Sequence, residues 1–439
     1  MKLNSVKKII INTGRCIVFV IYLVLLFVIG GIWLRLSYNM VSPYNKERLR
    51  YEVIGEYNYF KSLLDKPDTK TKTVTDGWNN FQPSEWPFQV LSLFTYGTRN
   101  LAQAGIIPKN EASRYMKIAI ERAMKPEYYN FIVPHFGDPF KDAKIKDNAF
   151  YLGHFVNMLA LYREVSGDSA FDELFHKFAH AFYINFKANP YSCLASYPGM
   201  TWTSEQAVPL RALKYHDDIF GTNYMEEVNR WKETMEARYT DPKANVLITG
   251  VESDTGKVWS GPRVIPNAWT ILFLHQVLPG YCQELYKNTK QAFLIKRLGL
   301  PVFTEWLYSP QISDGDTGPI IWGASPAGTC FVMGSAGIYA DSEVFWSVNI
   351  IADTIGLPVT IQGKRKYLLG SRIGTACFYF CRSMAFVSTK DLKPFPVRRL
   401  TTLYLIVSAL LLIIMLRIRT FIKYFFDKRP NKARPSKLK

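Results

Sequence analysis

Five segments of this 439-residue sequence combine carboxylates with turn residues, and four of them also carry Trp, Tyr or Phe. Aromatic faces and a few carboxylates are the groups that a pocket for a sugar or another uncharged organic ring requires. We therefore expect these segments to be loops that build one binding site. They cover residues 76–87, 134–140, 197–205, 250–263 and 313–319.

Glu205, Asp314 and Asp316 are the candidate acid and base. Two carboxylates from separate loops suit acid–base cleavage of a glycosidic bond, in which one of them protonates the leaving oxygen. Each residue also has an alternative role. Glu205 falls in the first turn of a predicted helix, where an acid bonds the free amides. The two aspartates lie in a Gly-rich turn and suit capping. Sequence spacing leaves their separation open.

Other residues are candidates to hold the substrate. His154, one turn into an apolar helix, and Tyr151 would orient or protonate it; a buried, hydrogen-bonded core histidine is the alternative. Arg263 would clamp an anionic group through two parallel N–H donors, with an ion pair inside its loop as the alternative. The predicted pocket lining is completed by Asp76, Trp86, Trp202 and Trp259.

These loops need a scaffold, and the pattern around them predicts paired helices, because apolar residues recur at helical spacing. A more apolar helix, a Gly-containing turn and a more polar helix repeat about every 50–60 residues. Repeated pairs with exposed apolar faces must stack. We therefore predict an all-α fold, an (α/α)6 barrel with the apolar helices inside. Five pairs cover 89–125, 148–182, 206–239, 268–298 and 320–355, and a sixth combines 41–64 with 373–386.

Metal and cofactor chemistry has little support in the sequence. His176 and His180 have the i, i+4 spacing of zinc ligands, but they lie on a predicted outer helix with no third ligand nearby in the sequence. The P-loop, G-x-G-x-x-G, G-x-S-x-G and H-E-x-x-H motifs are missing. The six cysteines form no C-x-x-C pair and are interpreted as buried free thiols. We expect neither a cofactor nor a metal.

The central stretch resembles the linalool dehydratase/isomerase family. The resemblance implies an (α/α)6 barrel, and it matches His154 to a histidine of that family's site. The family's two cysteines have no counterpart in residues 197–209, where Thr203, Ser204 and Glu205 stand instead. A carboxylate in place of a thiol looks more like the related sugar-processing barrels. The residues that carry the resemblance are Tyr151-Leu-Gly-His154, Met158, Leu161-Tyr162, Ser166-Gly-Asp168, the 197–205 loop and the 314–319 segment.

Apolar runs lie near both ends of the chain. Residues 17–34 and 400–416 are each long enough to cross a hydrocarbon core of about 30 Å. A cleaved signal peptide is the alternative for the first run, but no small-x-small site follows it. Basic residues precede the first run and follow the second, and such flanks stay cytoplasmic. The formal charge of +18 therefore indicates topology and contact with anionic lipid rather than nucleic-acid binding.

The sequence thus predicts a basic cytoplasmic tail (1–16), a transmembrane helix (17–34), an extracytoplasmic helical domain (35–397), a second transmembrane helix (400–416) and a basic tail (417–439). The predicted location is the inner (cytoplasmic) membrane, with the domain in the periplasm. We expect an enzyme, a hydrolase or lyase/isomerase, that uses acid–base chemistry on a glycan or glycolipid. The alternatives are a dehydratase or isomerase of an isoprenoid alcohol, and a non-catalytic scaffold that binds a protein partner in an envelope or secretion assembly.

Overall fold

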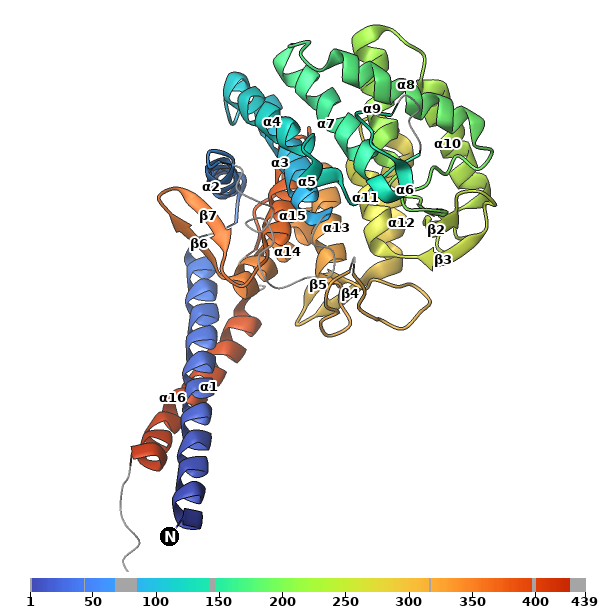
Figure 1. Ribbon diagram of the computed structural model, residues 1–439. Coiled ribbons are helices and arrows are strands. Elements are labelled where there is room, and N and C mark those ends of the chain that lie inside the picture. Colours follow the sequence, from blue (N-terminus) through green and yellow to red (C-terminus); the bar gives the residue numbers. More distant parts are fainter. Residues whose placement is uncertain are drawn as a thin grey trace, which may run out of the picture. The chain divides into compact units, whose positions relative to one another are not determined.

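The structure is a computed structural model that describes residues 2–42, 44–67, 85–142, 147–315, 317–396 and 400–426. The chain divides into two compact units. The smaller unit comprises Met1–Pro43, Asp353–Leu357 and Pro396–Lys439, and the larger comprises Tyr44–Ala352 and Pro358–Phe395. Figure 1 labels the elements of both.

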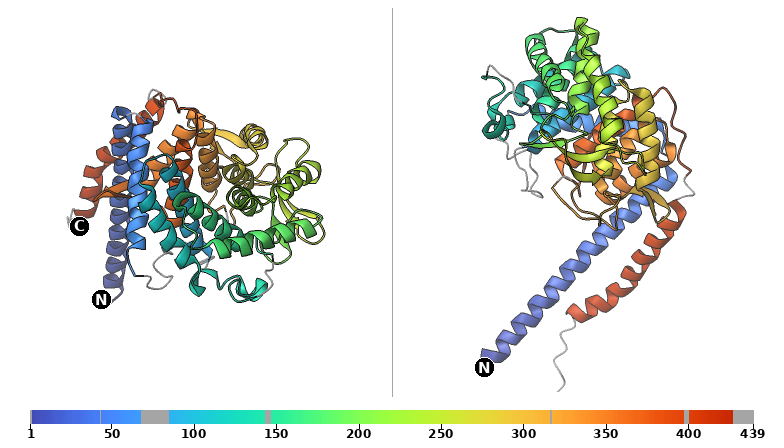
Figure 2. Two further views of the ribbon diagram at one scale, coloured as in Figure 1. Left: turned by 90° about the horizontal axis from the view of Figure 1, so that it is seen from above. Right: turned by 90° about the vertical axis from the view of Figure 1, so that its right-hand side faces the viewer.

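Six inner helices of the larger unit form a closed ring. Each packs against the next one along the chain, and the last, α15, packs against the first, α3. This closure confirms the predicted (α/α)6 barrel. In Figure 2 the ring runs from cyan α3 through green and yellow to orange α15. The inner helices are α3 (Glu85–Gln103), α7 (Tyr151–Ser166), α9 (Ala207–Phe220), α11 (Val264–Leu274), α13 (Pro326–Ile338) and α15 (Arg372–Ser383).

Outer helices alternate with the inner ones along the chain. Inner helices such as α7 bury nearly every residue, whereas an outer helix such as α10 buries one face and carries charge on the other. The outer helices are α2 (Lys46–Leu64), α4 (Lys109–Ala123), α8 (Asp172–Ala188), α10 (Met225–Arg238), α12 (Pro279–Phe293) and α14 (Ser342–Gly356). Short helical turns, α5 (Pro126–Tyr129), α6 (Val133–Phe136) and η2 (Met384–Phe386), fill the connections.

Local residues set the helix ends. Asn45, Ser325 and Ser371 are N-caps, because each side chain accepts a hydrogen bond from the backbone N–H three residues later. Gly167 and Gly221 end α7 and α9 with φ of 69° and 71°, the left-handed conformation that glycine adopts without strain. These signals explain why the helix pairs are visible in the sequence.

Short strands lie in the loops that lead into the inner helices. The helical pattern of the sequence did not predict them. β1 (Met200–Trp202), β2 (Ile248–Glu252) and β3 (Val258–Pro262) form an antiparallel sheet in that order. β4 (Leu294–Arg297) pairs with β5 (Leu300–Phe303), and β6 (Pro358–Ile361) pairs with β7 (Lys364–Tyr367). The helix pair predicted over 268–298 therefore ends at Phe293, where the chain turns into β4. The β1–β2–β3 sheet fixes the segment that leads into Glu205, because Thr203 N–H donates to Thr249 O.

The smaller unit is dominated by α1 (Lys2–Val41) and α16 (Thr401–Phe426), which pack along each other. The Tyr22 hydroxyl donates to Ile414 O at 2.5 Å, and Trp33 Nε1 donates to Ser408 Oγ at 3.0 Å. Within them, Cys16–Val41 and Thr401–Ile418 are long and apolar enough to cross a membrane, by length and composition alone. Most of their described apolar side chains are exposed.

Candidate active site

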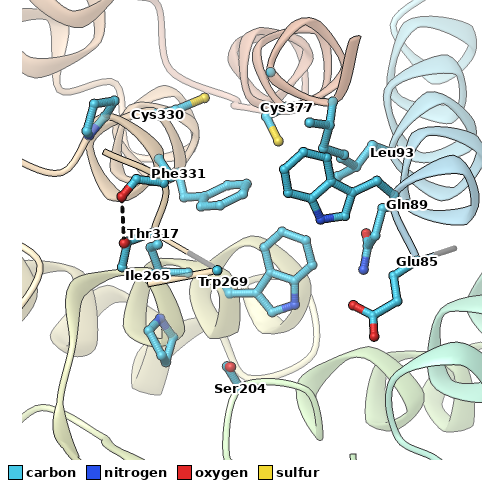
Figure 3. Close-up of a pocket in the computed structure, with 18 of the residues that line it drawn as sticks. Glu85, Gln89, Leu93, Ser204, Ile265, Trp269, Thr317, Cys330, Phe331 and Cys377 are labelled. Carbon is cyan, nitrogen blue, oxygen red and sulfur yellow. Dashed lines mark hydrogen bonds between the residues drawn. The ribbon is translucent and has the colours of Figure 1, made fainter. Parts of the chain in front are cut away.

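A cavity of about 370 Å³ opens among the N-terminal turns of the inner helices and the loops that lead into them. Figure 3 shows residues from α3, α11, α13 and α15 that surround it. The loops that contribute are 197–205 and, on either side of residue 316, Gly315 and residues 317–319, together with Phe150 before α7 and Arg263 before α11. Described residues from four of the five acidic segments thus line one cavity. None of the described residues of 134–140 lines the cavity.

Glu205 and His154 meet at the cavity wall. Glu205 lines the cavity, and its Oε2 atom lies 3.3 Å from His154 Nε2. The two atoms are within ion-pair distance, but their geometry does not yet make a hydrogen bond. The imidazole is fully buried, whereas the Glu205 side chain is 17% exposed. The pair therefore joins a buried base to a carboxylate that a ligand can reach, and such contacts tighten when a substrate binds.

Tyr96 lies behind His154 and extends this pair into a chain of three groups. The Tyr96 hydroxyl shares a hydrogen bond with His154 Nδ1 at 2.8 Å and donates to His154 O at 3.2 Å. Burial raises the pKa of the Tyr96 phenol, so it stays protonated and available as a hydrogen-bond donor. Carboxylate, imidazole and phenol thus follow one another from the cavity toward the core, an arrangement that fixes the imidazole ring.

Aromatic rings make up much of the cavity wall. Phe150 stacks on Tyr197 with ring centroids 5.9 Å apart, and Tyr197 meets Trp202 at 5.2 Å. Trp269 meets Phe331 edge to face at 4.9 Å. Trp269 is almost fully buried, and its Nε1 has no hydrogen-bond partner among the described residues. The wall suits a ligand with a large apolar or ring-shaped body.

Arg263 lines the cavity but is held by two carboxylates. Its Nε donates to Glu305 Oε1 at 2.9 Å, and its Nη2 lies 3.1 Å from Asp314 Oδ2. Glu305 also accepts a hydrogen bond from Ser325 Oγ at 2.7 Å. Burial raises the pKa of the Glu305 carboxyl, and the Arg263 guanidinium opposes that shift. Arg263 is therefore ion-paired, but with carboxylates of the segment that follows β5 and not with an acid of its own loop.

The other residues singled out in the sequence are placed as follows. Trp86 and Trp202 line the cavity, while Trp259 packs against Trp202 with centroids 5.1 Å apart and is not part of the lining. The Tyr151 hydroxyl donates to Ala123 O at 2.7 Å in the core, outside the lining. Asp314 bonds Arg263 and accepts from Thr317 N–H rather than facing Glu205. Asp76 and Asp316 lie outside the described residues.

Several cavity residues were not proposed from the sequence, and four of them carry carboxyl, amide or thiol groups. Glu85 and Gln89 enter from the first turns of α3, and Cys330 and Cys377 enter from α13 and α15. Burial raises the pKa of both thiols well above the ordinary value, so they are protonated at neutral pH. Glu85 lies near the end of segment 76–87, which combines aromatic and acidic residues. That position was the sequence signal that could have identified Glu85 as a site residue. No local pattern distinguishes the two cysteines from core thiols.

Histidines on the outer helices lie outside the cavity lining. His216, from the end of α9, brings its Nε2 to 2.9 Å from His176 Nδ1. His180 instead shares a hydrogen bond with the Tyr224 hydroxyl. Among the residues that the structure describes, no group of three or more His, Cys, Asp or Glu side chains is arranged to hold a metal ion.

One family model and several solved structures are similar to this chain. The family model of linalool dehydratase/isomerase matches residues 166–333, which include Glu205, Arg263, Trp269 and Cys330. An unsaturated glucuronyl hydrolase specific for heparin superposes with a TM-score of 0.50 at 11% identity, over 79% of this chain and 100% of that chain. A glycosyl hydrolase family 88 protein from Bacteroides vulgatus gives a TM-score of 0.48 at 10% identity, over 78% and 99% of the two chains.

At this level of identity the structural likeness establishes the fold alone. The resemblance noted in the sequence is confirmed for the matched stretch. The chain therefore carries a linalool dehydratase/isomerase-like segment, residues 166–333, within an (α/α)6 toroid of the kind found in the heparin-specific unsaturated glucuronyl hydrolase.

Proposed function

We propose that this protein is an acid–base enzyme, a lyase or isomerase that removes or relocates the hydroxyl group of an alcohol with a largely apolar body. The observation that carries the proposal is the Glu205–His154–Tyr96 chain, which opens on a cavity with aromatic walls. A filled ring centre would have favoured a non-catalytic scaffold, and the open cavity does not fit that alternative.

The reaction needs one group that gives a proton and one that takes it. Loss of water from an alcohol requires a proton for the departing hydroxyl and removal of a proton from the neighbouring carbon, so that a C=C bond forms. Glu205 and Glu85 are the carboxyl groups that line the cavity. We assign one of these transfers to Glu205 with His154 behind it, and the other to Glu85. Re-addition of water at another carbon completes an isomerisation.

His154 supports Glu205 by offering it a hydrogen bond from the imidazole Nε2–H group. In this proposal the single Tyr96 proton is shared between His154 O and Nδ1, so the neutral imidazole carries its own proton on Nε2, toward Glu205. When Glu205 gives its proton to the substrate, the Nε2–H group stabilises the carboxylate that remains. Hydrogen bonding to the charged form of a carboxyl group is what favours that form.

The cavity lining supports an alcohol with an apolar body over a polysaccharide. Most of the lining surface is aromatic or aliphatic, and its polar part comes from Glu85, Gln89, Ser204, Glu205, Arg263, Thr317 and Ser371. The family match over residues 166–333, which include Glu205 and Trp269, also favours an alcohol with an apolar body. A site for an extended glycan would need many hydrogen-bond partners for its hydroxyl groups.

The test uses the full chain in lipid nanodiscs with a panel of C5 to C15 isoprenoid alcohols in H₂¹⁸O. We expect alkene that has lost one water from the alcohol, or rearranged alcohol that carries ¹⁸O from the water added back, detected by gas chromatography and mass spectrometry, and no such product with Glu205→Gln. Full activity of the variant would refute the acid–base role of Glu205.

Cleavage of a glycolipid is the second candidate function. Two carboxyl groups on one cavity, Glu85 and Glu205, are what glycoside cleavage needs, and Trp86 and Trp202 provide faces on which a sugar ring can stack. The same preparation incubated with aryl glycosides and glycolipids separates the two functions. Release of reducing sugar without alkene formation would establish the second candidate and exclude the first.

We further propose that α1 and α16 anchor the protein in the cytoplasmic membrane, with both termini inside and the larger unit outside. The basic flanks and the exposed apolar side chains of both helices support this topology. A cysteine placed at exposed Glu233 should react with an impermeant maleimide on intact spheroplasts, whereas Cys16 should react only after permeabilisation. The reverse pattern would invert the topology.

A further inference from the structure

Two tight hairpins between α12 and α13 carry a large apolar side chain at the tip. The β4–β5 hairpin turns through residues 298–299, and a second one turns through residues 322–323, between the bridged Ile321 and Ala324. The first turn residue has a positive φ in each, 50° at Leu298 and 52° at Trp322. Such turns favour asparagine or glycine there, because a bulky side chain is strained at positive φ. The chain thus accepts strain at both tips, which points to a function for these side chains.

The two tips lie side by side and are exposed to solvent. Arg297 joins them, since its Nε donates to Trp322 O at 2.8 Å and its Cζ lies 5.8 Å from the centroid of the Trp322 ring. Ile320 N–H donates to Ser313 Oγ at 3.0 Å and so brings residue 312 toward residue 321. The β4–β5 hairpin is labelled in Figure 1. Four large apolar residues, each 47–66% exposed, form this surface, which we call the apolar rim: Leu298, Ile312, Ile321 and Trp322.

The apolar rim borders the cavity. Gly315 and residues 317–319 line the cavity, and in the chain they lie between Ile312 and Ile321. Pro326 and Ala327, soon after Trp322, line it as well. Gly315 and Pro319 are both lining and exposed, so this loop forms part of the cavity's outer edge. A structure that covers the apolar rim therefore lies next to the entrance of the cavity.

Two basic residues accompany the apolar rim. Lys296 is exposed and Arg297 is half-buried, and neither is paired with a carboxylate in the part of the chain that the structure describes. Exposed tryptophan and aliphatic side chains beside basic residues are typical of surfaces that lie on anionic lipid. The spans proposed for the same chain would tether this unit to a bilayer, so lipid would be present at a high effective concentration. These features favour lipid over a protein as the occupant of the apolar rim.

We propose that the apolar rim inserts into the interfacial layer of an anionic lipid bilayer, and that the cavity takes its apolar substrate directly from the lipid. The second part rests on the proposed function, because it names the route by which the alcohol reaches that site. An isoprenoid alcohol partitions into lipid, since each CH₂ group that leaves water contributes favourably. An entrance at the membrane surface therefore meets a much higher concentration of substrate than an entrance in water.

The experiment measures the depth of single spin labels in the full chain. A Cys16→Ser parent, whose other native cysteines are buried or half-buried, receives one label at Leu298→Cys or Trp322→Cys. Glu233→Cys, at an exposed position on α10, is the matched control, and the parent itself measures residual labelling. The protein is placed in nanodiscs that contain phosphatidylglycerol. We expect the ratio of collisions with oxygen to collisions with a water-soluble nickel chelate to be several times higher at both rim positions than at Glu233.

Two results would overturn membrane insertion. Rim labels that meet the nickel chelate as often as the Glu233 label does would place the apolar rim in water. Rim labels shielded from both reagents would instead show that protein, such as a second copy of the chain, covers them. Nanodiscs of phosphatidylcholine alone, or Lys296→Gln in the anionic nanodiscs, should lower the ratio at the rim. An unchanged ratio in both would refute the preference for anionic lipid.

A kinetic test addresses the entry of substrate from lipid. Trp322→Asn removes the apolar side chain and places a favoured residue in the turn, so the fold is retained. Trp322 does not line the cavity, and we expect a severalfold higher KM for alcohol dissolved in the nanodisc with kcat unchanged. Glu233→Gln should alter neither constant. An unchanged KM in Trp322→Asn would refute entry through the apolar rim.

These readouts separate this inference from the proposed function. If the rim labels lie in lipid but no alcohol is converted, the proposed reaction fails and the membrane contact stands. If alcohols are converted while the rim labels remain in water, the membrane contact fails and the reaction stands.

Discussion

Replacement of Glu205 by glutamine tests the chain of groups at the cavity wall. The change keeps the shape of the side chain and removes its charge and its exchangeable proton. Glu205 Oε2 lies 3.3 Å from His154 Nε2. In the proposed mechanism the neutral His154 donates from Nε2 to the carboxylate that forms when Glu205 loses its proton. A hydrogen bond to a charged group contributes up to about 3 kcal/mol.

A loss of about 3 kcal/mol from the transition state corresponds to a roughly 10²-fold lower rate. Loss of the proton transfer itself brings the expected decrease in kcat to 10²–10⁴-fold, about the usual contribution of an acid or base. KM should change little, because the aromatic wall that holds the substrate is intact. The measurement is the rate of formation of alkene or rearranged alcohol by the full chain in nanodiscs.

Two further variants show whether a loss of rate is specific. Glu252→Gln should leave kcat unchanged, and Tyr96→Phe, which removes the 2.8 Å contact with His154 Nδ1, should lower kcat about tenfold and alter its pH profile. The melting temperature of Glu205→Gln should stay within about 2 °C of the natural protein. A folded Glu205→Gln protein with kcat within threefold of the natural one would show that the pair is structural.

Three other predictions concern stability and reactivity. Burial, and the nearby His176, lower the pKa of His216 to about 4, whereas the unfolded chain binds this proton near pH 6.5. The free energy of unfolding should therefore fall as the pH drops from about 6.5 to 4, by up to roughly 1.4 kcal/mol per pH unit. His216→Asn should flatten this slope in denaturant titrations. Arg382 and Glu56 form a fully buried ion pair, so Glu56→Gln should lower the free energy of unfolding by about 3–5 kcal/mol; a loss below about 1 kcal/mol would contradict that burial. Burial raises the pKa of the Cys377 thiol, so Cys377 should react with iodoacetamide far more slowly than free cysteine at pH 7; reaction at the free-cysteine rate would show a thiolate at the cavity.

The architecture could be predicted because its signals are local. Helical periodicity depends on neighbours three and four residues away, and the turns at Gly167 and Gly221 are set by single residues. The pairing of a more apolar helix with a more polar one reports which layer each helix occupies. The six pairs of the ring therefore followed from the sequence, whereas the strand β4 did not, because residues 294–297 continue the apolar pattern of the helix before them.

The site was only partly predictable, since its contacts join residues far apart in the chain. Glu205 and His154 were each chosen from the sequence, but only the closed ring brings α7 beside the loop before α9. The pairing of Asp314 with Arg263 and the position of Glu85 likewise depend on loops that meet from opposite parts of the chain. Their separation is set by the rotation and spacing of several helices at once.

The sequence by itself determined the helix pairs, the layer of each helix and the apolar runs near both ends. Tertiary structure alone decided which side chains face the cavity. An inner helix is apolar on nearly all sides, so its periodicity does not mark the face that meets a ligand. Cys330 and Cys377 look like core residues in the sequence for that reason, and only the packing of α13 and α15 around the ring turns them toward the cavity.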